Sequence, residues 1–119
     1  MVEKIAYGGW PNCYRVSNGT VEAVITADIG PRVMRYGFCG GQNFFKEFAE
    51  QMGRAGETEW QLRGGHRIWI APEDPVKTYA PDNGPVTVEP TVDGVIATEP
   101  VEVSTGIEKP MPAYAPDGL

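Results

Sequence analysis

The residue types best suited to binding a polar ligand are concentrated in one stretch of the chain, from Leu62 to Pro75. This stretch contains the only histidine, one of the three tryptophans, two arginines and two carboxylates, all near the glycine pair Gly64-Gly65. A glycine pair lets the backbone turn sharply or approach a ligand closely, because no Cβ atom is in the way. Polar and aromatic side chains beside such a turn form the kind of surface that holds sugars.

Residues 66–71 alternate in character as a β-strand does, which predicts where the side chains after the turn point. This alternation places His66 and Trp69 on opposite faces of the strand. The main candidates for ligand contact are nevertheless the arginine, histidine and tryptophan around the turn, with a second arginine and a glutamate as further candidates. The predicted ligand-binding residues are Arg63, His66, Trp69, Arg32 and Glu73.

Each of these side chains also has a purely structural interpretation. A histidine at a strand edge often bonds to the backbone. Arginines in an acidic chain often pair with nearby carboxylates, here Glu59, Glu73 and Asp74, and such exposed pairs contribute little. A small β domain also needs large apolar side chains in its core, which favours core positions for Trp60 and Trp69.

No catalytic residue is predicted. Glu73 is near His66 in sequence, and an acid and a base flanking one anomeric carbon are what sugar mutarotation requires. Nothing in the spacing shows that these two side chains converge. The chain contains neither C-x-x-C nor H-E-x-x-H, so we predict no metal and no cofactor. Cys13 and Cys39 stand alone and are interpreted as small buried side chains.

Alternating and turn-forming residues predict several antiparallel strands. Residues 14–16 and 21–27 flank the turn pair Asn18-Gly19 and should form a hairpin. Asp93-Gly94 is a second hairpin turn, with valine-rich segments on both sides. The other predicted strands are residues 32–38, 66–71, 86–89, 95–98 and 101–104.

Residues 43–52 are the only helix that the pattern predicts. Asn43 can act as its N-cap, and apolar side chains expected in the core follow at helical spacing: Phe44, Phe45, Phe48 and Met52. The proline-rich residues 72–85 suit a long surface excursion rather than regular structure. Residues 110–119 contain too much proline for an interior strand, so we predict a single domain of residues 1–109 followed by an extended tail.

Length and composition fit one mostly β domain, an antiparallel β-sandwich or half-sandwich with one short helix. The chain has 119 residues, of which 15 are glycine and 11 are proline, as expected for short strands joined by turns. A net charge of -6 argues against partners that attract basic surfaces, namely nucleic acids and anionic membranes. No apolar run reaches the length of a membrane span and the start lacks a signal-peptide core, so we expect a cytoplasmic location.

Three segments, taken in order, resemble the amino-terminal part of the galactose mutarotase-like superfamily, most closely an uncharacterised bacterial branch. Residues 18–33 look like its opening hairpin. Residues 63–72 are similar to the Arg-Gly-Gly…Pro stretch of sugar-phosphate epimerases, and residues 105–109 look like a later strand entry. The resemblance implies a concave sheet face that holds a hexose, touched by Arg63 and His66 and more weakly by Arg32.

The resemblance also implies a missing catalytic base. In that superfamily, a glutamate from the carboxy-terminal half takes the proton of the anomeric hydroxyl, in chains more than twice as long. This chain ends before such a half begins, so we expect a truncated domain to which the base cannot be carried over.

The sequence leaves three functions open. The first is a small oligomeric β-sandwich module that binds a carbohydrate or another small polar ligand without catalysis. The alternatives are a protein–protein interaction module with no small ligand, and a sugar or sugar-phosphate mutarotase completed by another subunit. A half-sandwich leaves strand edges and an apolar face uncovered, which favours a homodimer with the tail as clasp. Trp10 and Tyr114 are candidates for exposed partner-binding anchors.

Overall fold

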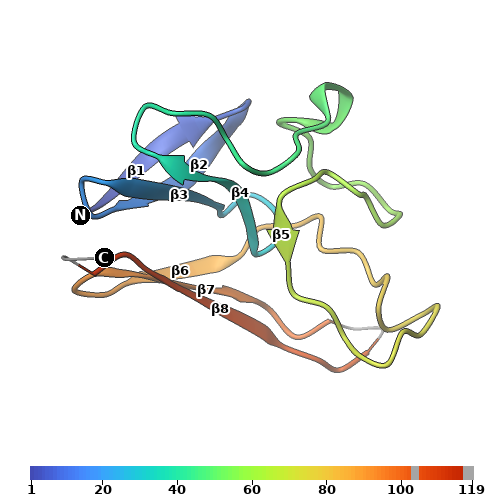
Figure 1. The fold of residues 1–119 in the computed structure, drawn as a ribbon. Helices are drawn as coiled ribbons and strands as arrows, with labels where there is room; N and C mark the ends of the chain where they lie inside the picture. The colour runs from blue at the N-terminus through green and yellow to red at the C-terminus, as the bar shows by residue number, and fades with distance from the viewer. Residues whose placement is uncertain (103–104, 117–119) are drawn as a thin grey trace.

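The computed structural model describes residues 1–102 and 105–116, which fold into two antiparallel sheets packed face to face (Figure 1). The larger sheet has the strand order β1-β2-β3-β4-β5, and the smaller sheet has the order β6-β7-β8. The predicted mostly β, antiparallel architecture is therefore confirmed. The strands are β1 (Val2–Tyr7), β2 (Trp10–Ser17), β3 (Val21–Thr26), β4 (Arg32–Phe38), β5 (His66–Arg67), β6 (Thr87–Pro90), β7 (Gly94–Glu99) and β8 (Lys109–Tyr114).

Both predicted hairpins are present. The side-chain oxygen of Asn18 accepts hydrogen bonds from the backbone N–H groups of Thr20 and Val21, each at 2.9 Å, and Gly19 has a φ of +89°. β2 and β3 pair across this turn, and β6 and β7 pair across the turn before Gly94. Local turn chemistry thus joins the strands in the way that the sequence predicts.

Two apolar clusters lie on opposite faces of the larger sheet. The cluster between the sheets consists of Val16, Ile25, Val95 and Ala97. The cluster on the outer face consists of Trp10, Cys13, Val24, Ile29 and Met34, with Met52 packed against it. Trp10 is 1% exposed, so the prediction that it is an exposed anchor is wrong. Of the two cysteines, both free, Cys13 is buried as predicted and Cys39 is half-buried.

The predicted helix at residues 43–52 does not form. Asn43 binds the edge of β4 instead of capping a helix: its Nδ2 donates to the carbonyl of Met34 at 2.9 Å, and its Oδ1 accepts from the N–H of Tyr36 at 3.1 Å. The N–H of Phe44 then donates to the carbonyl of Tyr36. The segment keeps only the short 3-10 helix η1 (Ala49–Gln51), and Phe44, predicted in the core, is 62% exposed.

The predicted strand at residues 66–71 is reduced to β5, which pairs with the start of β4. Residues 72–85 lack regular structure, as predicted. They are not a purely surface excursion, however, because several of their side chains are at most 5% exposed: Thr78, Ala80, Asp82 and Asn83. Apart from Ala80 these side chains are polar, and buried polar groups need hydrogen-bond partners.

Half of the predicted tail belongs to the sandwich. Residues 109–114 form β8, which pairs with β7 at an edge of the smaller sheet, with Pro112 opposite Ile96. Proline is tolerated at an edge because the side of the backbone on which it lacks an N–H faces away from the partner strand. The folded unit therefore continues beyond the predicted boundary at residue 109. Val101 and Glu102 are not in a strand, while residues 103–104 and 117–119 lie outside the described residues.

Candidate functional site

A pocket of about 120 Å³ lies beside the Gly64-Gly65 turn, where β4 and β5 meet. Besides the two glycines it is lined by Arg32, Trp60, Leu62, His66, Arg67 and Trp69. None of these lining residues is acidic. The pocket brings together three of the predicted ligand-binding residues, including His66 and Trp69. These two share it because strand β5 ends at Arg67, so the strand alternation that would separate them does not continue.

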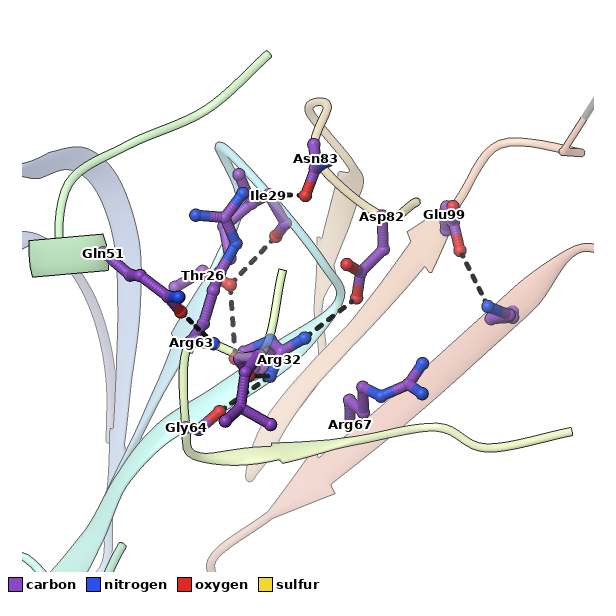
Figure 2. A network of polar contacts seen from close by, with 12 residues as sticks. Thr26, Ile29, Arg32, Gln51, Arg63, Gly64, Arg67, Asp82, Asn83 and Glu99 are labelled. Carbon is purple, nitrogen blue, oxygen red and sulfur yellow. Dashed lines mark hydrogen bonds and ion pairs between the residues drawn. The ribbon is translucent and has the colours of Figure 1, made fainter. Parts of the chain in front are cut away.

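Arg32, at the start of β4, is 2% exposed and holds the glycine turn in place. Its Nη1 donates to the carbonyls of Leu62 and Gly64 at 2.8 and 2.7 Å. Its Nη2 lies 3.4 Å from Oδ2 of Asp82, which reaches it from the proline-rich excursion (Figure 2). The Nε of Arg32 has no hydrogen-bond partner. Burial lowers the pKa of Arg32, and Asp82 offsets this only in part.

Arg67 of β5 is 5% exposed and lies against both pocket tryptophans. Its guanidinium carbon is 3.7 Å from the ring centroid of Trp69 and 5.1 Å from that of Trp60. Nη2 donates to the carbonyl of Thr78 at 3.0 Å, but Nε and Nη1 have no partner, nor does the indole N–H of Trp60. Three pocket side chains therefore bring buried N–H donors that lack acceptors, an arrangement that proteins usually avoid.

Trp69 is 53% exposed, so the core position that its size favoured is wrong. Trp60 is half-buried. The ring of Tyr79 packs edge-on against both indoles, at centroid distances of 5.1 Å to Trp60 and 5.7 Å to Trp69. Tyr79 in turn donates its hydroxyl to Glu73, and this bond raises the pKa of Tyr79. Glu73 therefore bonds to the tyrosine that packs on both indoles and does not line the pocket.

Arg63 points away from the pocket and ties other segments together. It is fully buried, with a φ of +56°, and its Nη2 donates to Glu57 at 2.8 Å and to Asn83 at 2.7 Å. Its Nη1 donates to the carbonyl of Arg54 at 3.1 Å, and only Nε lacks a partner. Glu57 takes the place of the predicted partner Glu59, and the strongest sequence candidate for ligand contact is held as a structural clamp.

His66 is exposed at the rim of the pocket. Its ring stacks on that of Phe45, with the centroids 6.5 Å apart and the planes 20° from parallel. The structure thus places a histidine at the mouth, two arginines at the inner wall and two indoles around them. This arrangement can bind an anion through charge and N–H donors, and a flat ring through the indole faces.

A cluster of buried charges lies between the sheets, next to Arg67 (Figure 2). Lys109 Nζ is 3.1 Å from a carboxylate oxygen of Glu102 and 3.8 Å from one of Glu99. Burial raises the pKa of Glu99 to about 8; Lys109 opposes this rise, whereas Glu102 and Asp82 add to it. The neutral form of the Glu99 carboxyl group is therefore favoured more than in an exposed glutamate.

A larger hollow of about 440 Å³ opens on the other side of this cluster, lined mainly by prolines and by Glu99 and Glu102. Its carboxylates already face Lys109, so they do not call for a further cation. No pattern in the sequence indicates this cluster, because charged residues at a strand end or in a proline-rich segment are normally exposed. The pattern also does not single out Asp82, Arg67 or Trp60 as residues of the site.

Comparisons with family models, with curated proteins and with solved structures give no match to the chain. The resemblance to the galactose mutarotase-like superfamily therefore stays a prediction from the sequence. Among residues 1–102 and 105–116, no group of three or more histidine, cysteine, aspartate or glutamate side chains could hold a metal ion. Within the same residues, no helix has the length and apolar character needed to cross a membrane.

Proposed function

We propose that this protein is a binding module for a small carbohydrate that carries an anionic group, and that it does not catalyse a reaction. The observation that carries the proposal is the set of unpartnered N–H donors on Arg32, Arg67 and Trp60 around a pocket without a lining carboxylate. These donors are buried, so a carboxylate or phosphate on the sugar would accept bonds from them after a small movement of the side chains that line the pocket.

Arg67 has two unpartnered nitrogens, whereas Arg32 and Trp60 have one each. A buried N–H without an acceptor costs roughly 1–3 kcal/mol, and a bond to a charged partner is stronger than one between neutral groups. Arg67 lies among the carboxylates of the buried cluster, but none of them forms an ion pair with it within the described residues. An anionic ligand would supply that missing partner, and a guanidinium is suited to bind it through two parallel bonds.

The aromatic side chains at the pocket, Trp60, Trp69 and Tyr79, favour a sugar ring as the rest of the ligand. Pyranose rings present C–H groups on their faces and hydroxyl groups around their rims, so they pack flat on an indole while bonding sideways. The Trp69 side chain is about half exposed, and Tyr79 packs edge-on against it and holds its orientation. His66 lies at the mouth, where it can bond to a rim hydroxyl.

The lining of the pocket argues against catalysis. Mutarotation needs an acid and a base on opposite sides of one carbon. Glu73, the candidate base, is bonded to Tyr79 outside the pocket lining, which leaves His66 as the one side chain of that lining suited to general acid or base catalysis.

The test is titration of the protein with D-glucuronate, glucose 6-phosphate and glucose, followed through the indole N–H signals of the tryptophans by NMR. We expect saturable shifts with the two anionic sugars and about tenfold weaker binding of glucose. The Arg67→Gln variant should lose about tenfold in affinity for the anionic sugars. The exposed Arg54→Gln variant, which removes the same charge elsewhere, serves as the matched control. Equal affinity for all three sugars would refute the anionic preference, and no shift with any of them would refute the function.

A further inference from the structure

An unbroken series of aromatic rings leads from the pocket across the surface of the larger sheet. From the pocket rim outward, His66 stacks on Phe45, and Phe45 lies 6.4 Å from Tyr36. The ring of Phe44 is 6.1 Å from that of Tyr36 and 6.2 Å from that of Phe38. We name the outer part of this series, Tyr36, Phe38 and Phe44, the aromatic strip; these rings are 44%, 59% and 62% exposed.

The strip lies on the face of the larger sheet that packs on the smaller sheet, at a place that the smaller sheet does not cover. Tyr36 is directly opposite Ala23 of β3, and directly opposed residues share a face. Ala23 packs against the cluster between the sheets. Three large exposed rings on this face form an apolar surface of the kind that usually binds something.

A second copy of the chain could cover this face by adding a strand to the free edge of β8. The backbone of β8 does not favour such an addition. The N–H of Ala115 donates to Asp93 in the turn before β7, so in this register N–H groups of odd-numbered residues point toward β7. Those of even-numbered residues point to the free edge, and there Pro110 and Pro112 have no N–H. Of the three outward positions in β8, Tyr114 is left as the one donor, and strand addition there is blocked.

A carbohydrate chain needs no backbone donors from the protein, and the strip is continuous with the proposed sugar pocket through Phe45 and His66. Resting on the function proposed above, we infer that the strip is an extension of that site, which receives the following units of an acidic oligosaccharide whose first unit occupies the pocket. Each exposed ring supplies a face for one C–H surface of the chain. The anionic sugar in the pocket is then the terminal unit of an acidic oligosaccharide.

The experiment compares the affinity of the protein for galacturonic acid and for its linear trimer and hexamer by isothermal titration calorimetry. We expect at least about tenfold tighter binding of the hexamer than of the monomer. Phe44→Ala and Phe38→Ala should reduce hexamer affinity to that of the monomer and leave monomer affinity unchanged. Both rings are largely exposed, so these variants are expected to fold. Tyr114→Ala, an exposed ring on β8, is the matched control and should bind the hexamer like the wild type.

The outcomes separate this inference from the proposed function. Saturable binding of the monomer with no gain for the hexamer overturns the extension and leaves the pocket function standing. No binding of either overturns both. If the strip variants keep their hexamer affinity but change the molar mass measured by light scattering, the strip is a self-association surface and the inference is wrong.

Discussion

Arg63 and Arg67 stand on either side of the same glycine pair and are both almost completely buried, yet their surroundings differ. Arg63 has a carboxylate, a carboxamide and a carbonyl as partners, whereas Arg67 has one carbonyl and two tryptophan rings. Burial alone therefore does not identify a functional arginine. The satisfied side chain holds the fold together, and the one with spare donors in a pocket is the candidate for ligand binding.

The largest effect that separates the two arginines is on stability. Replacing Arg63 with methionine leaves Glu57, Asn83 and the carbonyl of Arg54 without their shared donor, and should lower the free energy of unfolding by about 3 kcal/mol. Urea denaturation followed by tryptophan fluorescence measures this loss. The exposed Arg54→Met variant should stay close to the wild type, and a loss in Arg63→Met no greater than in this control would show that the clamp is unimportant.

The buried cluster beside Arg67 predicts a pH dependence of stability. The pKa of Glu99 is raised to about 8 in the folded protein, above the ordinary value of 4.5 for a glutamate. The folded state therefore holds this proton more tightly than the unfolded state. Its contribution to stability is complete below about pH 4.5 and is lost as the pH rises to about 8, so the free energy of unfolding should fall across this range.

Urea denaturation at a series of pH values from about 5 to about 8 tests this trend. Glu99→Gln carries a permanently neutral group and should flatten the curve, so that the variant is more stable than the wild type at the alkaline end. Glu89→Gln, at an exposed position of β6, is the control and should keep the slope. A wild-type curve that rises across this range would contradict the assignment.

Arg67→Met, in contrast to Arg63→Met, should leave stability nearly unchanged. Methionine fills much of the space between the two indoles and removes the unpartnered N–H groups, so the free energy of unfolding should stay within about 1 kcal/mol of the wild type. Thermal unfolding of Arg67→Met and Arg63→Met side by side provides the measurement. Equal destabilisation of both variants would mean that Arg67 is also a structural clamp.

The smallest effect is expected at the exposed charges of the larger sheet. Arg15 bonds Glu3 at 2.8 Å on the surface of β1 and β2, with both side chains partly exposed. Glu3→Gln should change the free energy of unfolding by less than about 0.5 kcal/mol, because solvent screens such a pair. Denaturation at low and high salt checks this. A loss comparable with that of Arg63→Met would remove the distinction between buried and exposed arginine pairs.

The elements that could be predicted are those whose cause is local. Asn18 bonds the backbone that follows it, and the turn at Asp93-Gly94 closes β6 on β7, so both hairpins follow from short stretches of sequence. The helix at residues 43–52 failed for a tertiary reason. Asn43 has the chemistry of an N-cap, but the backbone of β4 offered it a donor and an acceptor, and the segment followed the strand edge instead.

The sequence predicted the region of the candidate site but not all of the side chains that line it. The concentration of histidine, arginine and tryptophan around Gly64-Gly65 identified the pocket region, and Arg32, His66 and Trp69 do line the pocket. A strand over the whole of residues 66–71 would place His66 and Trp69 on opposite faces. The strand instead ends at Arg67, where the pairing with β4 stops, because strand length depends on the partner strand.

The sequence by itself determined a mostly β domain, its hairpin turns and the region in which arginine, histidine and tryptophan gather, because periodicity and turn residues act over a few neighbouring positions. The tertiary structure alone decided which arginine is a clamp and which is free to bind. That choice depends on Glu57, Thr78, Asp82 and Asn83, which come from irregular segments with no periodic pattern. The acceptors of a buried donor come from segments that are distant in sequence, so the residues near the donor do not predict them.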